Sequence, residues 1–115
     1  MDKYKYLTTN EKHALDELIQ SLRKKFGNRL MRIKLFGSKM RGDFDNASDI
    51  DLFLIFNSKV DWRFKDLVYD IIFEINLKYD VFISTRIYSS TRLKENKIKT
   101  LPFIKNVVEH GIDLI

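Results

Sequence analysis

Seven residues between positions 37 and 51 have the types and spacing that phosphate and metal chemistry needs: Gly37, Ser38, Arg41, Gly42, Ser48, Asp49 and Asp51. A glycine lets the backbone approach a phosphate closely, and a serine adds a hydroxyl and an N–H at a helix start. With this composition, Gly-Ser-x-x-Arg-Gly followed by Ser-Asp-x-Asp arises by chance about once in a million. The segment is therefore our first candidate site, with an ordinary strand-ending turn as the alternative for Gly37 and Ser38.

Asp49 and Asp51 supply two carboxylates in one short stretch of chain. Alternate residues of a strand point to the same side, and the apolar residues from Ile50 onward predict a strand. Two carboxylates about 5 Å apart repel by roughly 3 kcal/mol at an effective dielectric constant of about 20, a cost that a divalent cation between them removes. Oxygen ligands suit Mg²⁺ and also Mn²⁺. We therefore predict Asp49 and Asp51 as catalytic metal ligands, with turn or capping residues as the alternative.

A third carboxylate is expected because two-metal phosphoryl or nucleotidyl transfer usually needs another acid beside the attacking hydroxyl. Several downstream acids lie at the cap or on the polar face of a helix expected over residues 62–77. Asp80 instead opens the apolar stretch Val81–Ile83. We predict Asp80 as the third catalytic and metal-binding carboxylate, with a polar helix-to-strand connection as the alternative.

The same loop carries two cations, Lys39 and Arg41. Either can neutralise phosphate charge, and an arginine can do so through two parallel hydrogen bonds. Arg41 is the stronger candidate, although it could pair instead with Asp43 or Asp45 in its own loop.

The elements around the loop are predicted from hydrophobic periodicity and from end signals such as the capping-box spacing of Thr8 and Glu11. Strand 50–56 is apolar on both faces, which is typical of a central strand. We predict one α+β domain over residues 1–115, a mixed sheet flanked by helices. The expected order is a helix ending at Gly27, strands over 30–36 and 50–56, a helix over 62–77, a strand over 80–88 and a helix over 102–110.

The composition of the 115-residue chain narrows the function classes. The absence of cysteine excludes disulfides, a thiolate metal site and a cysteine nucleophile. The two histidines, His13 and His110, are too far apart in the sequence to form a His-rich zinc motif. No apolar run reaches about 18 residues and Met1–Thr9 lacks an apolar leader segment, so we expect a cytoplasmic protein without a membrane partner.

The formal net charge of +5 lies within one segment, residues 86–105, which we term the basic strip. A solvated face is one interpretation, and contact with phosphates, nucleic acid or an acidic partner is the other. A template channel makes about ten phosphate contacts, more than six basic residues provide, so we do not expect a nucleic-acid partner. The strip contains Arg86, Arg92, Lys94, Lys97, Lys99 and Lys105, against the single acid Glu95.

The run from Gly37 to Leu52 resembles the signature of the minimal nucleotidyltransferases, within the polymerase-beta-like nucleotidyltransferase superfamily. The resemblance covers most of the chain, through the carboxylate at Asp80 to the ending from Pro102 to Gly111. It implies the polymerase-beta-like fold, with ATP or another NTP as substrate and Mg²⁺ as the metal, Mn²⁺ being the alternative. The residues implied are Asp49, Asp51 and Asp80 for the metals, and Gly37 and Ser38 for the nucleotide phosphates. We predict Arg41 and Ser48 of the same run as further nucleotide-binding residues.

The resemblance also implies a role for the chain. Family members of this size are commonly antitoxin partners of helical HEPN ribonuclease toxins, and some transfer AMP from ATP to a toxin tyrosine. Our first hypothesis is therefore an enzyme that transfers a nucleoside monophosphate, first of all AMP, to an acceptor hydroxyl on a protein such as a HEPN toxin. A chain of 115 residues has little surplus to enclose a small acceptor, which favours a protein surface.

Two alternatives remain open at this point. One is an antitoxin that binds and occludes its partner without needing catalysis, using the basic strip as a contact surface. The weaker one is an aminoglycoside-type antibiotic nucleotidyltransferase, which normally carries a second domain for its acceptor. For the protein partner, the alternative to a HEPN-type toxin is a second copy of this chain in a homo-oligomer.

Overall fold

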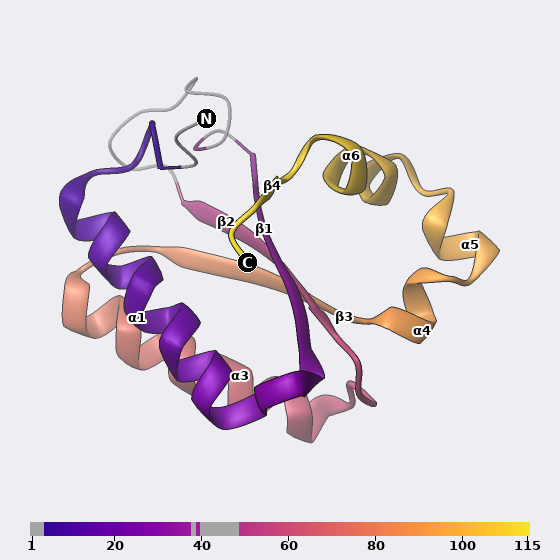
Figure 1. Cartoon of the computed structure of the whole chain (residues 1–115), viewed down its shortest axis with the longest axis horizontal. Helices are drawn as coiled ribbons and strands as arrows, with labels where there is room; N and C mark the ends of the chain where they lie inside the picture. The colour runs from indigo at the N-terminus through magenta and orange to yellow at the C-terminus, as the bar shows by residue number, and fades with distance from the viewer. Residues whose placement is uncertain (1–3, 38, 40–48) are drawn as a thin grey trace.

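A computed structural model of the chain describes residues 4–37, 39 and 49–115. Within these residues, helices cover both faces of a four-stranded sheet (Figure 1). Helices α1 and α3 pack on one face, and α6 covers the other. The elements are α1 (Thr9–Phe26), a 3₁₀ turn (Gly27–Arg29), β1 (Leu30–Phe36), β2 (Ile50–Phe56), α3 (Trp62–Tyr79), β3 (Ile83–Ser89), α4 (Ser90–Leu93), α5 (Asn96–Lys99), α6 (Pro102–His110) and β4 (Ile112–Asp113).

The sheet has the strand order β3-β2-β1-β4. β1 runs antiparallel to both β2 and β4, whereas β2 and β3 are parallel. A parallel pair needs a crossover connection, and α3 provides it. The mixed sheet flanked by helices confirms the predicted α+β class.

β2 is buried on both faces, as its sequence predicts. Its even-numbered residues, Ile50 to Phe56, lie in the core that α1 and α3 complete. On the opposite face, Phe53 and Ile55 pack with Ile104 and Val107 of α6. Because side chains alternate along a strand, Asp51 lies on the α6 side of the sheet.

The strand predicted over residues 80–88 begins three residues later, at Ile83. Asp80 instead ends α3 in the left-handed conformation, with a φ of 51°, and its N–H donates to the Asn76 carbonyl. The Asn76 side chain then pairs with both backbone groups of Ile83, at 2.9 and 3.1 Å. Periodicity does not reveal this cap, because Asp80 and Val81 also fit a strand pattern.

The C-terminal part contains three elements that sequence reasoning misses. The four-residue helices α4 and α5 fall within the basic strip and are too short to show a helical period. The two-residue strand β4 pairs with β1, and Lys34 forms an ion pair of 2.9 Å with Asp113 across it. None of the described helices combines the length and apolar character that crossing a bilayer requires.

A polar contact joins α1 to the end of α3. Oε1 of Glu17 accepts hydrogen bonds from Nζ of Lys78 at 2.6 Å and from the Tyr79 hydroxyl at 3.0 Å. The hydrogen bond from Lys78, followed by that from Tyr79, lowers the pKa of the Glu17 carboxyl below its ordinary value. The same contact raises the pKa of the Lys78 ammonium.

This contact predicts a pH-dependent contribution to stability. Because the pKa of Glu17 is lower in the folded state, its contribution is present above the ordinary glutamate pKa and is lost as the pH falls through the folded value. We expect Lys78→Met to lower the free energy of unfolding at pH 7 and to have a smaller effect at about pH 3. Urea denaturation at both pH values measures this, with Lys25→Met on exposed α1 surface as the control. A Lys78→Met loss of equal size at both pH values contradicts the assignment.

Candidate active site

β1 ends beside one of the candidate carboxylates. Phe36 pairs with Asp51 across the β1–β2 ladder, and Gly37 follows with a φ of 78°. A Cβ at position 37 would lie only 2.5 Å from Oδ2 of Asp51. Both the backbone conformation and this approach therefore require a glycine. The structure places Gly37, predicted to contact phosphate, directly against Asp51.

The other oxygen of Asp51 is held from the neighbouring strand. Ser84 lies in register with Asp51 across the parallel β2–β3 pair, and its hydroxyl donates to Oδ1 at 2.8 Å. The Asp51 side chain is half-buried between these two neighbours. Its orientation is therefore fixed from both sides, with Oδ2 turned toward Gly37.

Asp49 lies just before β2 and is exposed. The ladder is already formed at Ile50, whose N–H donates to the Phe82 carbonyl at 2.7 Å. Strand alternation then puts Asp49 and Asp51 on the same side of the chain, as their spacing predicts. Both acids stand at the start of the central strand.

Asp80, predicted as the third carboxylate, does not join this pair in the structure. It is an exposed residue at the C-terminal cap of α3. Among the described residues, no group of three or more Asp, Glu, His or Cys side chains could hold a metal ion together. The position level with Asp51 on β3 is Ser84, a hydroxyl rather than an acid. The three-carboxylate cluster is not formed because Asp80 is used to end the helix.

Three of the predicted nucleotide-binding residues, Ser38, Arg41 and Ser48, lie outside the described residues. Their roles stay predictions. Gly42 lies outside them as well.

Asp51 opens into a cavity of about 380 Å³. Arg86 brings a positive charge to this cavity, and its guanidinium lies 4.7 Å from the centre of the Phe103 ring on α6. Phe103 also packs edge-on against Phe36, with ring centres 5.4 Å apart. The lining combines a carboxylate, two hydroxyls and a cation on an aromatic wall: Phe36, Asp51, Ser84, Thr85 and Arg86.

Sequence reasoning does not assign Ser84 or Arg86 to the site. Arg86 carries a sequence signal, since it begins the basic strip. Ser84 carries none, because the register of β2 against β3 cannot be read from either strand alone.

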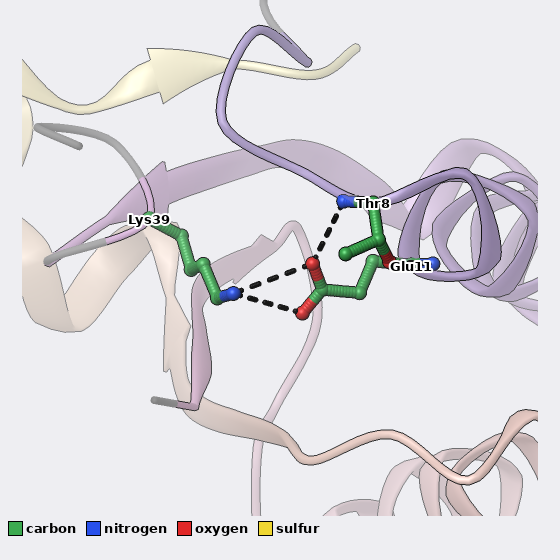
Figure 2. A network of polar contacts seen from close by, with 3 residues as sticks. All are labelled: Thr8, Glu11 and Lys39. Carbon is green, nitrogen blue, oxygen red and sulfur yellow. Dashed lines mark hydrogen bonds and ion pairs between the residues drawn. The ribbon is translucent and has the colours of Figure 1, made fainter. Parts of the chain in front are cut away.

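Lys39 is buried and faces α1 rather than open solvent. Its Nζ lies 3.1 Å from Oε2 and 3.3 Å from Oε1 of Glu11. Oε1 of Glu11 also accepts the Thr8 N–H at 2.9 Å, and the Thr8 hydroxyl accepts the Glu11 N–H at 3.1 Å (Figure 2). The predicted capping box is thus confirmed and carries an additional partner. Lys39, expected as a phosphate-neutralising cation, instead fixes the chain after Gly37 to the start of α1.

Comparison with known families decides how this site is interpreted. A model of the nucleotidyltransferase domain matches residues 15–114. This chain belongs to the nucleotidyltransferase family. The predicted family and enzyme class are therefore confirmed.

Two similar proteins come from Methanocaldococcus jannaschii. "Putative protein adenylyltransferase MJ0604" is 38% identical over 102 residues, which cover 89% of this chain and 95% of that protein. "Putative protein adenylyltransferase MJ0141" is 36% identical over 87 residues, covering 76% and 81%.

Solved structures share the fold of this nucleotidyltransferase at lower identity. A chain from "Crystal structure of the toxin-antitoxin with AMP-PNP" has a TM-score of 0.57 and 19% identity, over 87% of this chain and 72% of that one. A mutant of the MntA-HpeT toxin-antitoxin has a TM-score of 0.57 and 17% identity, with the same coverage. The likeness confirms the predicted nucleotidyltransferase fold.

The donor atoms at the site fit the divalent metal that nucleotidyl transfer generally uses. Asp49 and Asp51 offer carboxylate oxygens, and Ser84 fixes one oxygen of Asp51 while leaving Oδ2 toward Gly37. A small, hard cation such as Mg²⁺ takes one or two protein carboxylates and fills its other positions with water and substrate phosphate. The described pair matches that requirement without a third acid.

The contact of Gly37 with Asp51 predicts that a methyl group added at position 37 lowers both the stability of the fold and the affinity for nucleotide. Gly37→Ala forces a Cβ against Oδ2 and strains a positive-φ position, so we expect a loss of about 2 kcal/mol in the free energy of unfolding. We also expect weaker binding of ATP with Mg²⁺, measured by calorimetry. Gly27→Ala is the matched control, since Gly27 has a φ of 55° and its Cβ meets nothing within 4 Å. Equal effects of both substitutions on ATP affinity contradict the interpretation.

The buried ion pair predicts that Glu11 matters for stability more than a surface acid does. Glu11→Ala leaves the Lys39 ammonium buried without this partner and opens the capping box, so we expect a loss of about 3 kcal/mol in thermal or urea unfolding. Glu17→Ala on the same helix removes an exposed ion pair and serves as the control, with a much smaller expected loss. If both variants lose the same free energy of unfolding, the ion pair between Lys39 and Glu11 does not stabilise the fold more than an exposed pair does.

Proposed function

We propose that this nucleotidyltransferase transfers AMP from ATP to a hydroxyl group on a protein partner, with Asp49 and Asp51 holding the divalent cations of a two-metal reaction. The observation that carries the proposal is the contact between Gly37 and Asp51. It brings the turn expected to bind phosphate against the carboxylate expected to bind metal. The relatives named as protein adenylyltransferases support AMP as the transferred group and a protein as the acceptor.

The proposed transfer breaks a phosphoanhydride bond of ATP and forms a phosphodiester bond to the acceptor. The acceptor oxygen bonds to the α-phosphorus of ATP, the bond from that phosphorus to the bridging oxygen breaks, and pyrophosphate leaves. The hydroxyl proton passes to solvent. A bound divalent cation supplies neutralisation of phosphate charge and favours the ionised form of the acceptor oxygen.

The chain's own residues position and stabilise the reacting groups. Ser84 holds Asp51 through one oxygen, so that its metal-binding edge does not turn away. Arg86 places positive charge in the same cavity, where negative charge accumulates on the phosphates. Stacking on Phe103 limits the motion of the Arg86 guanidinium, which lowers the entropic cost of using it.

A protein partner is supported by the exposed surface of α3. Trp62, Phe73 and Leu77 recur at helical spacing and are 68%, 63% and 68% exposed. Large apolar side chains gathered on one exposed face mark interaction surfaces. The structural neighbours come from toxin-antitoxin complexes. We therefore propose a HEPN-type toxin as the partner and acceptor.

The same site also supports a second candidate function, an antitoxin that neutralises its partner by occlusion. The observation that favours it is the missing third carboxylate, since no described acid stands beside Asp49 and Asp51. Without an acid next to the acceptor, transfer would be slower, whereas binding would be unaffected.

Labelled ATP separates these two functions. The chain is incubated with α-phosphate-labelled ATP, Mg²⁺ or Mn²⁺ and the protein encoded by its neighbouring gene. We expect label on that protein and a loss of at least about a hundredfold in rate with Asp51→Asn, because a metal ligand contributes several kcal/mol. Asp70→Asn, an exposed acid on α3, is the control and keeps the wild-type rate.

Neutralisation of the partner is measured with the same variants. Asp49→Asn with Asp51→Asn loses neutralisation while still binding the partner if transfer is the function. A double variant that binds and neutralises as the wild type does identifies occlusion. Binding without any label transfer by the wild type rules out the adenylyl-transfer proposal.

A further inference from the structure

The edge of β3 carries a second cavity, which the proposed reaction does not use. Its volume is about 460 Å³, and it wraps around the strand between α3 and α4. The residues that matter here are Lys65 and Tyr69 of α3, Thr85, Arg86 and Ile87 of β3, and Arg92 of α4.

The charge of this cavity has one sign. Lys65, Arg86 and Arg92 come from three different elements, and no acidic residue lines the cavity with them. Within the described part of the chain, none of the three forms an ion pair with a carboxylate. Three cations around one hollow favour an anionic occupant. Two of them, Arg86 and Arg92, belong to the basic strip.

The backbone of β3 is open along the same cavity. β3 is an edge strand, with β2 as its neighbour in the described sheet. Because the Phe82 carbonyl faces β2, the alternate residues Ile83, Thr85 and Ile87 turn their N–H and C=O groups outward. Asn76 satisfies both groups of Ile83. At Thr85 and Ile87 the open edge presents two donors and two acceptors to an added strand.

The edge cavity adjoins the cavity of Asp51. Thr85 and Arg86 line both of them. A chain segment bound along β3 therefore runs two strand spacings, about 9.5 Å, from the strand that carries Asp51. Because the two cavities share these residues, the edge cavity is part of the surface around the candidate active site.

We propose that the β3 edge docks the acceptor protein through an extended acidic segment, which adds a strand to the sheet and brings its hydroxyl residue to the Asp51 cavity. The backbone groups of Thr85 and Ile87 bind the segment's main chain, and Lys65 with Arg92 selects acidic side chains at its flanks. The proposal rests on the proposed function for the identity of the acceptor. The docking itself needs no catalysis.

A peptide-binding experiment tests the proposal. The probe is a fluorescein-labelled ten-residue peptide in which glutamate alternates with threonine or valine around a single tyrosine. We expect the full chain to bind it, and Lys65→Glu with Arg92→Glu to weaken the dissociation constant by at least about tenfold, because two attractive charges become repulsive. The matching peptide with lysine in place of glutamate regains affinity for the charge-reversed variant.

Two controls keep the result specific. Lys97→Glu reverses an exposed charge of the basic strip on α5, outside the cavity, and leaves the binding constant within about twofold. The single variant Arg92→Glu reverses the charge of one exposed side chain of the cavity. Circular dichroism verifies that each variant is folded. Equal binding by the wild type and the folded double variant overturns the proposal.

Amide exchange locates the bound peptide and separates this proposal from the enzymatic one. Binding slows exchange at Thr85 and Ile87, and slowing confined to α6 or α3 overturns strand addition. All binding is measured without ATP, so that it does not depend on transfer. Peptide binding by a chain that transfers no label supports the docking proposal and contradicts the proposed transferase activity. Label transfer without binding at the β3 edge supports the transferase activity and contradicts the docking proposal.

Discussion

The approach of the Gly37 backbone to the Asp51 carboxylate is the constraint on which the site depends. A side chain at position 37 would occupy the space of Oδ2, so the turn after β1 and the Asp51 carboxylate of β2 can meet only through a glycine. The antiparallel pairing of Phe36 with Asp51 sets the level at which they meet, and the Ser84 hydroxyl holds Asp51 from the other side. Three strands thus fix one carboxylate.

Much of the fold is predictable because its signals are local. The capping box of Thr8 and Glu11 marks the start of α1, and the apolar run from Ile50 to Phe56 identifies a strand covered on both faces. That run predicts burial on both faces, and the structure supplies the partners, α1 with α3 on one face and α6 on the other. Gly37 and Asp51 are recognisable for the same reason, since both belong to one continuous motif.

Two of the three site assignments that sequence reasoning misses depend on contacts between distant residues. Asp80 fits a strand pattern, but it adopts a left-handed conformation that ends α3 and remains exposed. Ser84 gains its role only from its register beside Asp51. The sequence favours Lys39 as a phosphate-binding cation, but the structure pairs it with Glu11, 28 positions earlier. For Ser84 and Lys39 the deciding partner lies far away in the sequence, whereas the Asp80 cap contacts Asn76 only four positions earlier.

The parallel pairing of β2 with β3 also bears on how the protein acquires its site. Ser84 and Asp51 are 33 positions apart, and the crossover helix α3 lies between their two strands in the sequence. Closing so large a loop is entropically costly, so such pairings form late. During synthesis, a nascent chain that has emerged only as far as α3 contains both aspartates yet lacks the hydroxyl that orients one of them. The hydrogen bond that orients Asp51 is therefore complete only after β3 has been made and has paired with β2.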